Sequence, residues 1–174
     1  MTPNKQQALF GKFPDLFRMG IEQTGLMKYG ICTEDGWFKL IYELCEAIMG
    51  ECQRLGLKPG KPGFPVVVQV KEKFGTLRFY LHETSLPEPE YSESEIEDLR
   101  RGEGPGHDKM ERFDQIRIDQ PKRNMESIYD LVHEAGRLSE SICERCGEPG
   151  GLSRYGGWVQ VRCPQCGKEE QHGR

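Results

Sequence analysis

The sequence predicts an α+β fold: a helix, a β-hairpin that forms a small antiparallel sheet, a second helix, and a C-terminal cysteine-rich ribbon. Three observations predict it. Two long stretches space their apolar residues three and four apart, two short alternating stretches flank a glycine turn, and two Cys-x-x-Cys pairs stand near the C-terminus. We expect a body over 1–142 with an inserted segment at 83–123, a ribbon at 143–167, and a polar tail at 168–174.

The first helix is predicted between Asp35 and Gly56, with Thr33 or Asp35 as its N-cap and the glycine at its end. Its apolar face comprises Phe38, Ile41, Cys45, Ile48, Cys52 and Leu55. The two cysteines on this face are interpreted as core residues. Residues 1–30 predict only a short helix near 14–19, because Gly11 and Pro14 interrupt the apolar spacing.

The hairpin is predicted from strands at 66–72 and 76–82, joined by a short turn over 73–75. Alternation assigns Val66, Val68, Val70, Leu77, Phe79 and Leu81 to the helix-covered face. The opposite face receives Gln69, Lys71, Arg78, Tyr80 and His82. That face is either a cationic and aromatic platform for nucleic acid or the solvated side of an ordinary sheet, and the small number of basic residues favours the solvated side.

The inserted segment at 83–123 is acidic, with twelve acidic and seven basic residues. Ser94-Glu-Ile-Glu97 fits a capping box, which predicts one or two helical turns near 95–101. The alternation around Ile116 and Ile118 predicts a further short strand. The segment is either a solvated surface excursion, which is the commoner case, or an acidic docking surface for a basic partner. The residues of that docking surface would be Glu93, Glu95, Glu97 and Asp98.

The second helix is predicted from an N-cap at Asn124 to the first cysteine pair. Its apolar face comprises Met125, Ile128, Leu131, Val132, Ala135, Leu138 and Ile142. His133 lies away from this face and is expected to be exposed. Because the helix leads directly into the cysteines, we expect the ribbon to be anchored rigidly on the body.

The two Cys-x-x-Cys pairs predict a structural zinc site whose ligands are Cys143, Cys146, Cys163 and Cys166. Four thiolates leave no open position for water, so the Zn²⁺ ion would not be catalytic. A redox pair normally stands at the N-terminus of a helix, where the sequence predicts neither pair. Disulfides and an iron–sulfur cluster are the remaining alternatives.

The ribbon itself is predicted to contain strands at 152–155 and 158–162. These strands carry a candidate contact patch for nucleic acid, which comprises Arg154, Tyr155, Trp158 and Arg162. In this interpretation Lys71, Arg78 and Tyr80 of the hairpin contribute further contacts. In the alternative interpretation, Trp158 simply packs on the anchoring helix. The two interpretations have equal support from the sequence.

Composition excludes several classes of function. The formal net charge is −4. The chain therefore lacks the excess of basic residues that is typical of a dedicated nucleic-acid-binding protein. No apolar run approaches the length of a membrane span, so no membrane contact is expected. The scattered histidines and the absence of a phosphate-binding loop predict no enzymatic activity. Three cysteines remain outside the predicted zinc site, which fits a reducing compartment.

Several runs resemble a family of short proteins encoded by bacteriophages and prophages. They are Val68-Gln-Val-Lys-Glu-Lys-Phe-Gly-Thr-Leu-Arg-Phe-Tyr80, Gly36-Trp-Phe with the helix after it, and Cys143-Glu-x-Cys-Gly-x-Pro-Gly-x-Leu152 with Gly157-Trp158. The resemblance implies a viral setting and the cytoplasm of a bacterial host, and it implies no mechanism.

Two functions are therefore expected. The first is a non-enzymatic zinc-containing accessory protein of a phage that binds a host protein or nucleoprotein complex and inhibits a bacterial defence system. The alternative is a nucleic-acid-binding zinc-ribbon module. Salt dependence distinguishes them, because a phosphate-binding protein loses affinity steeply as salt increases.

Overall fold

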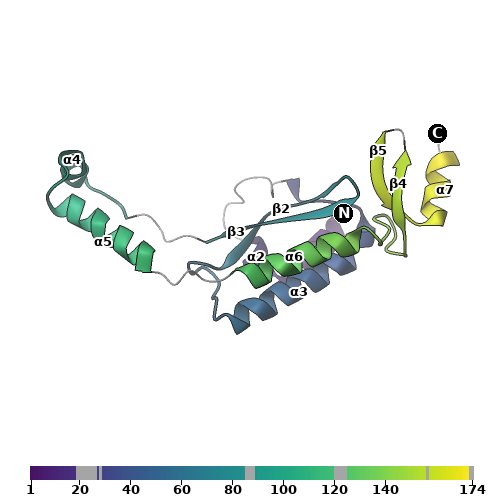
Figure 1. The fold of residues 1–174 in the computed structure, drawn as a ribbon, viewed down its shortest axis with the longest axis horizontal. Helices are drawn as coiled ribbons and strands as arrows, with labels where there is room; N and C mark the ends of the chain where they lie inside the picture. Colours follow the sequence, from purple (N-terminus) through teal and green to yellow (C-terminus); the bar gives the residue numbers. More distant parts are fainter. Residues whose placement is uncertain (19–26, 28, 85–88, 120–124, 156, 173–174) are drawn as a thin grey trace.

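The computed structural model describes residues 1–174 apart from 19–26, 28, 85–88, 120–124, 156 and 173–174. The molecule is elongated: a central α/β body carries the cysteine ribbon at one end and two inserted helices at the other (Figure 1). Helices and small sheets are combined as the sequence predicts, so the α+β fold class is confirmed.

The sheet of the body has three strands in the order β1-β2-β3. Strands β2 (Pro65–Lys73) and β3 (Thr76–Glu83) form the predicted antiparallel hairpin, with a two-residue turn at Phe74 and Gly75. The strand β1 (Ile31–Cys32) pairs parallel to β2 and was not predicted. A strand of two residues is too short to show an alternating pattern.

A β-bulge in β2 changes which of its side chains face the core, so part of the prediction for this strand is wrong. The pairing register shifts between Val67 and Gln69, so the side chains before the bulge are displaced by one position relative to β3. Val67 is therefore a core residue, and Val68, which was assigned to the core, is only half-buried. Downstream of the bulge the prediction is correct, because Val70 is buried and Lys71 lies on the opposite face.

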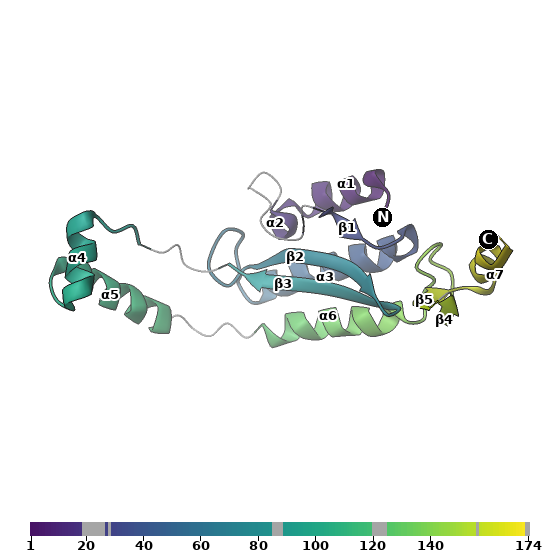
Figure 2. The ribbon, with the colours of Figure 1, turned by 90° about the horizontal axis from the view of Figure 1, so that it is seen from above.

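Two helices cover one face of this sheet, α3 (Phe38–Arg54) and α6 (Glu126–Ser139) (Figures 1 and 2). Cys45 and Cys52 are buried between them and the sheet, as predicted. The predicted N-caps of α3 are wrong, because a 3-10 turn over Asp35–Trp37 precedes the helix and Trp37 occupies the cap position. Asn124, the predicted cap of α6, lies outside the described residues.

The N-terminal region forms two helices rather than the single one predicted near 14–19. Helix α1 spans Pro3–Lys12 and α2 spans Pro14–Phe17. Both have a proline in their first turn, where the missing N–H costs no hydrogen bond. They lie beside the sheet in Figure 2 and contribute Leu9, Leu16 and Phe17 to the core.

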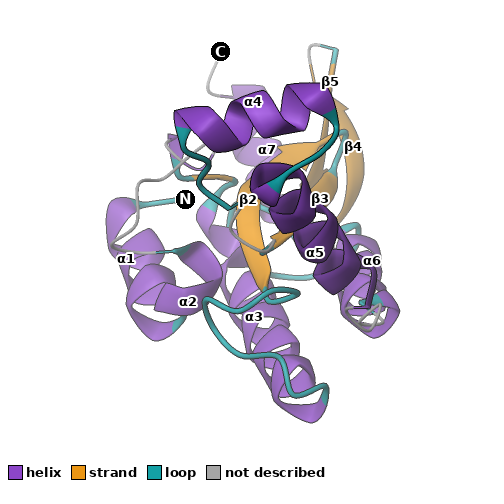
Figure 3. Cartoon of the chain, turned by 90° about the vertical axis from the view of Figure 1, so that its left-hand side faces the viewer, coloured by secondary structure: helices purple, strands orange, loops and turns teal. Residues whose placement is uncertain are grey.

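The inserted segment is a helical hairpin of α4 (Glu93–Arg101) and α5 (Pro105–Asp119). The strand predicted around Ile116 is wrong, because that residue lies in α5. The predicted capping box is displaced by two positions: Ser92 is the N-cap and Glu95 is its partner. Viewed from its own end of the molecule, α4 lies across α5 and in front of the body (Figure 3).

The ribbon contains β4 (Gly151–Tyr155) and β5 (Trp158–Arg162), which pair antiparallel within one residue of the predicted bounds. It ends in α7 (Pro164–His172). The predicted polar tail is therefore helical as far as His172.

Candidate metal centre

Four thiols converge where the ribbon meets the body. Each of Cys143, Cys146, Cys163 and Cys166 offers a sulfur, and all four sulfurs lie within 4.8 Å of one another. The sulfurs of Cys146 and Cys163 are 3.6 Å apart. A disulfide needs about 2.05 Å, whereas thiolates on a tetrahedral ion with bonds of about 2.3 Å lie about 3.8 Å from one another. The arrangement therefore fits a four-thiolate metal site.

The first cysteine pair is shaped by backbone hydrogen bonds. The amide of Gly147 donates to the carbonyl of Cys143 at 2.8 Å, which closes the turn that carries Cys146. Gly147 has φ of +86°, a value that glycine adopts without a steric penalty. The amide of Cys143 in turn donates to Glu148 at 2.8 Å. These contacts hold the two sulfurs of this pair on one side of a tight loop.

The second cysteine pair stands at the start of α7, contrary to the sequence-based expectation that neither pair lies at a helix N-terminus. Cys163 directly precedes the helix, and its sulfur accepts a hydrogen bond from the amide of Cys166 at 3.4 Å. That bond lowers the pKa of the Cys163 thiol to about 7. Burial raises the pKa of Cys166. A helix N-terminus also favours the thiolates that a cation needs.

The first cysteine loop is built into the body through Gly36 and Trp37. The amide of Gly36 donates to the carbonyl of Glu144 at 2.7 Å, and the indole of Trp37 donates to the carbonyl of Ile142 at 2.8 Å. A Cβ atom at Gly36 would stand 2.2 Å from the carbonyl oxygen of Cys143. Only glycine therefore fits this contact. The expectation of a rigidly anchored ribbon is supported by these bonds.

A buried ion-pair cluster joins the ribbon to the same segment. The Arg162 side chain is 1 % exposed and contacts Glu34 at 2.7 Å and Glu144 at 3.6 Å. Burial raises the pKa of the Glu144 carboxyl, which also accepts a hydrogen bond from the amide of Glu34. Arg162 thus fixes the ribbon and is inaccessible, so its assignment to a nucleic-acid contact patch is wrong.

The other residues of the predicted ribbon patch have different positions. Trp158 is 71 % exposed, so it does not pack on the anchoring helix. Arg154 is exposed on β4, and the side chain of Tyr155 lies outside the described residues. Lys71 and Arg78 lie on the uncovered face of the body sheet, as predicted.

The four acidic residues predicted to bind a partner divide into two groups. Asp98 is buried and accepts a hydrogen bond from the amide of Gly106, while Glu95 closes the capping box and pairs with Lys109 at 3.1 Å. These two carboxylates hold α4 against α5. The other two, Glu93 and Glu97, are exposed, and Glu97 pairs with the exposed Arg100 at 3.1 Å.

A second group of possible ligands lies on α5. His107, Asp108 and Glu111 could also place ligand atoms within 4.8 Å of one another. They are exposed or half-buried on one helix, and exposed acidic groups commonly gather without an ion, whereas three of the four cysteines are buried. The cysteine cluster is therefore the metal site that the geometry supports.

Comparisons with protein-family models, with curated proteins and with solved structures find no match for the chain. The resemblance to bacteriophage and prophage proteins therefore stays a prediction. Among the described residues, no helix combines the length and the apolar content that crossing a membrane requires.

Proposed function

We propose that the cysteine cluster holds a structural Zn²⁺ ion. Four sulfur ligands at tetrahedral spacing suit zinc better than a hard cation, which prefers oxygen. Cys143, Cys146, Cys163 and Cys166 would all coordinate the ion, so its contribution would be to fold the ribbon. Elemental analysis of protein purified without added metal tests this: about one zinc per chain supports it. Iron with visible sulfide-to-iron absorption would contradict it.

We propose that the protein is non-enzymatic and binds a protein partner through the α4–α5 hairpin. The observation that carries this proposal is that the described residues of the hairpin form no hydrophobic core. No described residue from α4 or α5 belongs to the hydrophobic core, and the buried members are Asp98 and Gly106. The two helices instead meet through polar contacts. An isolated helical hairpin without an apolar core is marginal in water, and a partner would complete it.

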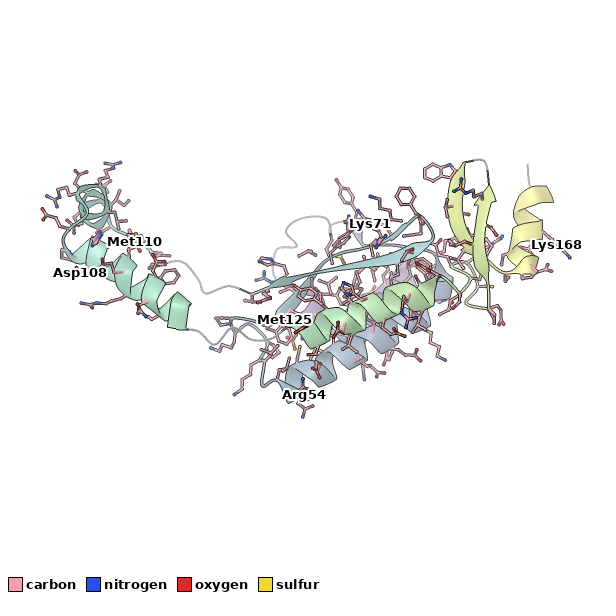
Figure 4. The ribbon with its side chains drawn as sticks, in the orientation of Figure 1. Arg54, Lys71, Asp108, Met110, Met125 and Lys168 are labelled. Carbon is pink, nitrogen blue, oxygen red and sulfur yellow. The ribbon has the colours of Figure 1, made fainter. Side chains whose placement is uncertain are left out.

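The hairpin carries the apolar side chains that such a partner would cover. The half-buried Met110 and Phe113 and the exposed Ile116 recur every third residue along α5, and Ile96 is exposed on α4 (Met110 is labelled in Figure 4). Amphipathic helices commonly dock with such residues in a groove of another protein. The rim of that groove would be basic, because residues 89–116 contain nine acidic and four basic side chains.

The biological setting of the proposal rests on the resemblance alone. In that setting the protein is an accessory factor of a phage in the cytoplasm of its bacterial host. Its partner is a host protein or nucleoprotein complex, and inhibition of a bacterial defence system is the role we propose. The acidic hairpin suits this role, because nucleic-acid-binding proteins expose the basic surfaces that it would occupy.

A nuclease-treated pull-down from bacterial lysate tests the partner proposal. We compare the metal-loaded protein with an Ile96→Ser, Ile116→Ser double variant, whose changed side chains are exposed and lie outside the hydrophobic core. A protein that the wild type retains and the double variant loses supports docking through the hairpin. Glu93→Gln should weaken the same capture, because the Glu93 side chain is exposed and, among the described residues, forms no ion pair.

The matched control is Lys39→Gln, which removes an exposed charge from α3, outside the hairpin. It should leave capture unchanged. A captured protein that the double variant and the wild type bind equally would contradict the proposal. A signal that disappears with nuclease would favour the alternative function, a nucleic-acid-binding ribbon module.

A further inference from the structure

The uncovered face of the body sheet holds two like charges directly opposite each other. The register of β2 and β3 pairs Lys71 with Arg78, and directly opposed side chains project from the same face. Figure 4 shows Lys71 on the side of the sheet away from α3 and α6. Like charges in this position destabilise a sheet. The fold alone therefore gives no reason for the pair.

The basic side chains of this face lack an ion-pair partner in the part of the chain that the structure describes. Among the described residues, Lys71, Lys73 and Arg78 form no ion pair. Nine other basic side chains of the described residues do, namely Lys5, Lys39, Arg54, Arg100, Arg101, Lys109, Arg137, Arg145 and Arg162. An unfavourable local arrangement, such as two like charges opposite each other, is typical of a functional site when no contact within the protein compensates for it. The chemistry that would relieve this repulsion is an anion.

Two exposed aromatic rings accompany the uncompensated charges. The Lys71 ammonium lies 5.5 Å from the centre of the Tyr80 ring, and the Lys73 ammonium lies 5.3 Å from that of Phe74. Tyr80 is 43 % and Phe74 is 68 % exposed. Phe74 also has φ of +56° in the hairpin turn, a conformation that is unfavourable for a bulky residue. A ring is thus kept at a position where asparagine or glycine would be more stable.

The ribbon packs against the hairpin turn and adds one more exposed cation. The hairpin turn rests on β4 and β5, since a Cβ atom at Gly75 would meet the side chain of Leu152 at 2.3 Å and that of Val159 at 3.5 Å. Arg154 pairs with Val159 and so shares this side of the ribbon, where it is exposed and, among the described residues, has no ion pair. We call the whole surface the cationic sheet face; it comprises Lys71, Lys73, Phe74, Arg78, Tyr80 and Arg154.

We propose that the cationic sheet face binds single-stranded nucleic acid. Phosphates would lie against Lys71, Arg78 and Arg154, and bases would stack on the two rings. Single strands offer unstacked bases together with phosphates, and sheets that bind them use this combination of aromatic and basic side chains. In a duplex the faces of the bases are stacked and inaccessible. An acidic peptide would pair with the basic side chains but would not require the aromatic rings. The site is separate from the hairpin of the proposed function.

Fluorescence anisotropy with a labelled oligothymidylate of about 16 nucleotides tests the proposal on the full, metal-loaded chain. Arg78→Gln should weaken binding and reduce the slope of log affinity against log salt by about 0.7, the value for one phosphate contact on a single strand. Tyr80→Leu should weaken binding about 5- to 100-fold and leave that slope unchanged, since it removes only stacking. Arg78→Gln should not lower the melting temperature, because it relieves a repulsion.

Lys39→Gln is the control of equal charge, because Lys39 is exposed on α3 and pairs with Glu43. It should change neither affinity nor slope. The proposal is overturned if the oligonucleotide fails to bind at about 50 mM salt. It is also overturned if duplex DNA competes as well as the single strand, or if polyglutamate binds and Tyr80→Leu has no effect. That last result would assign the face to an acidic peptide.

Discussion

The ribbon and the α4–α5 hairpin lie at opposite ends of the body and are held in opposite ways (Figure 1). The ribbon is joined to the body by the Gly36 and Trp37 hydrogen bonds and by Val161, which is part of the main core. The hairpin is held by its own polar contacts and contributes nothing described to that core. The body therefore determines where the ribbon lies, whereas the hairpin determines only its own shape.

Metal removal should have the largest effect, and it should spread from the ribbon into the body. Structural zinc contributes about 10–16 kcal/mol of apparent binding free energy in small zinc modules, and that energy is folding energy. Cys143→Ser should release the metal, unfold the ribbon and lower the melting temperature of the body, because Trp37 loses its partner at Ile142. Elemental analysis and thermal unfolding followed by circular dichroism measure both effects.

Cys32→Ser provides the control for that experiment, since Cys32 is an exposed cysteine outside the cluster. It should retain the metal and the melting temperature. Full metal retention in Cys143→Ser would show that the four sulfurs are not a single site. An unchanged body would show instead that the two units fold independently, as the sequence alone allowed.

Gly36→Ala should have the next largest effect, with the metal ligands intact. Its Cβ would lie 2.2–2.6 Å from backbone atoms of the first cysteine loop, and backbone atoms yield less readily than the end of a side chain. Overpacking and the loss of one hydrogen bond together cost about 2–4 kcal/mol. We expect the melting temperature to fall by roughly 5–15 °C.

Gly50→Ala is the matched control for that substitution. Gly50 lies within α3, and a Cβ atom there would meet nothing within 4 Å. Alanine is a better helix former than glycine, so this variant should gain about 0.5–1 kcal/mol. If Gly36→Ala were as stable as Gly50→Ala, the ribbon would be less closely joined to the body than its contacts indicate.

Asp98→Asn should affect the hairpin alone. Asp98 accepts from the amide of Gly106 and pairs with Arg101, so its change should speed hydrogen exchange of the α4 and α5 amides. The melting temperature of the body should not change. Glu97→Gln, which removes only an exposed pair with Arg100, should leave exchange as it is. A drop in the body's melting temperature on Asp98→Asn would contradict the independence of the hairpin.

Acidification should have the smallest effect near neutrality. A hydrogen bond from the amide of Gly106 lowers the pKa of Asp98, and one from the amide of Ser92 lowers that of Glu95. Their stabilisation of the hairpin is therefore complete above the ordinary carboxyl pKa values and is lost as pH falls through the lower folded values. The amide chemical shift of Gly106 should titrate below about pH 3.9, and Asp98→Asn should abolish that step. A midpoint above that value would show that the bond is weak.

The sequence predicted those parts of the fold that local patterns specify. The apolar faces of α3 and α6 and the turn before Thr76 follow from the spacing of side chains along one segment. The bulge at Val67 does not, because it is set by the pairing of two strands. Ile116 alternates as in a strand but lies in a helix, since three or four residues cannot distinguish the two periods.

The candidate metal site was predictable because its ligands repeat at a fixed spacing. The contact of Gly36 with the first cysteine loop was not, since it joins segments more than a hundred residues apart. The only local signal was a glycine next to tryptophan before a helix, and many unrelated contacts could produce it. The prediction that Arg162 contacts nucleic acid failed for the same reason, because only the fold brings Glu34 and Glu144 close to this side chain.

The contact between Trp37 and Ile142 also determines when the body can finish folding during synthesis. The two residues are 105 positions apart, and a ribosome adds roughly 5–20 residues per second. The Trp37 indole therefore waits about five to twenty seconds for the carbonyl of Ile142. During that interval the nascent chain exposes apolar surface of the kind that chaperones recognise, and it completes its body only when Ile142 and Val161 have emerged.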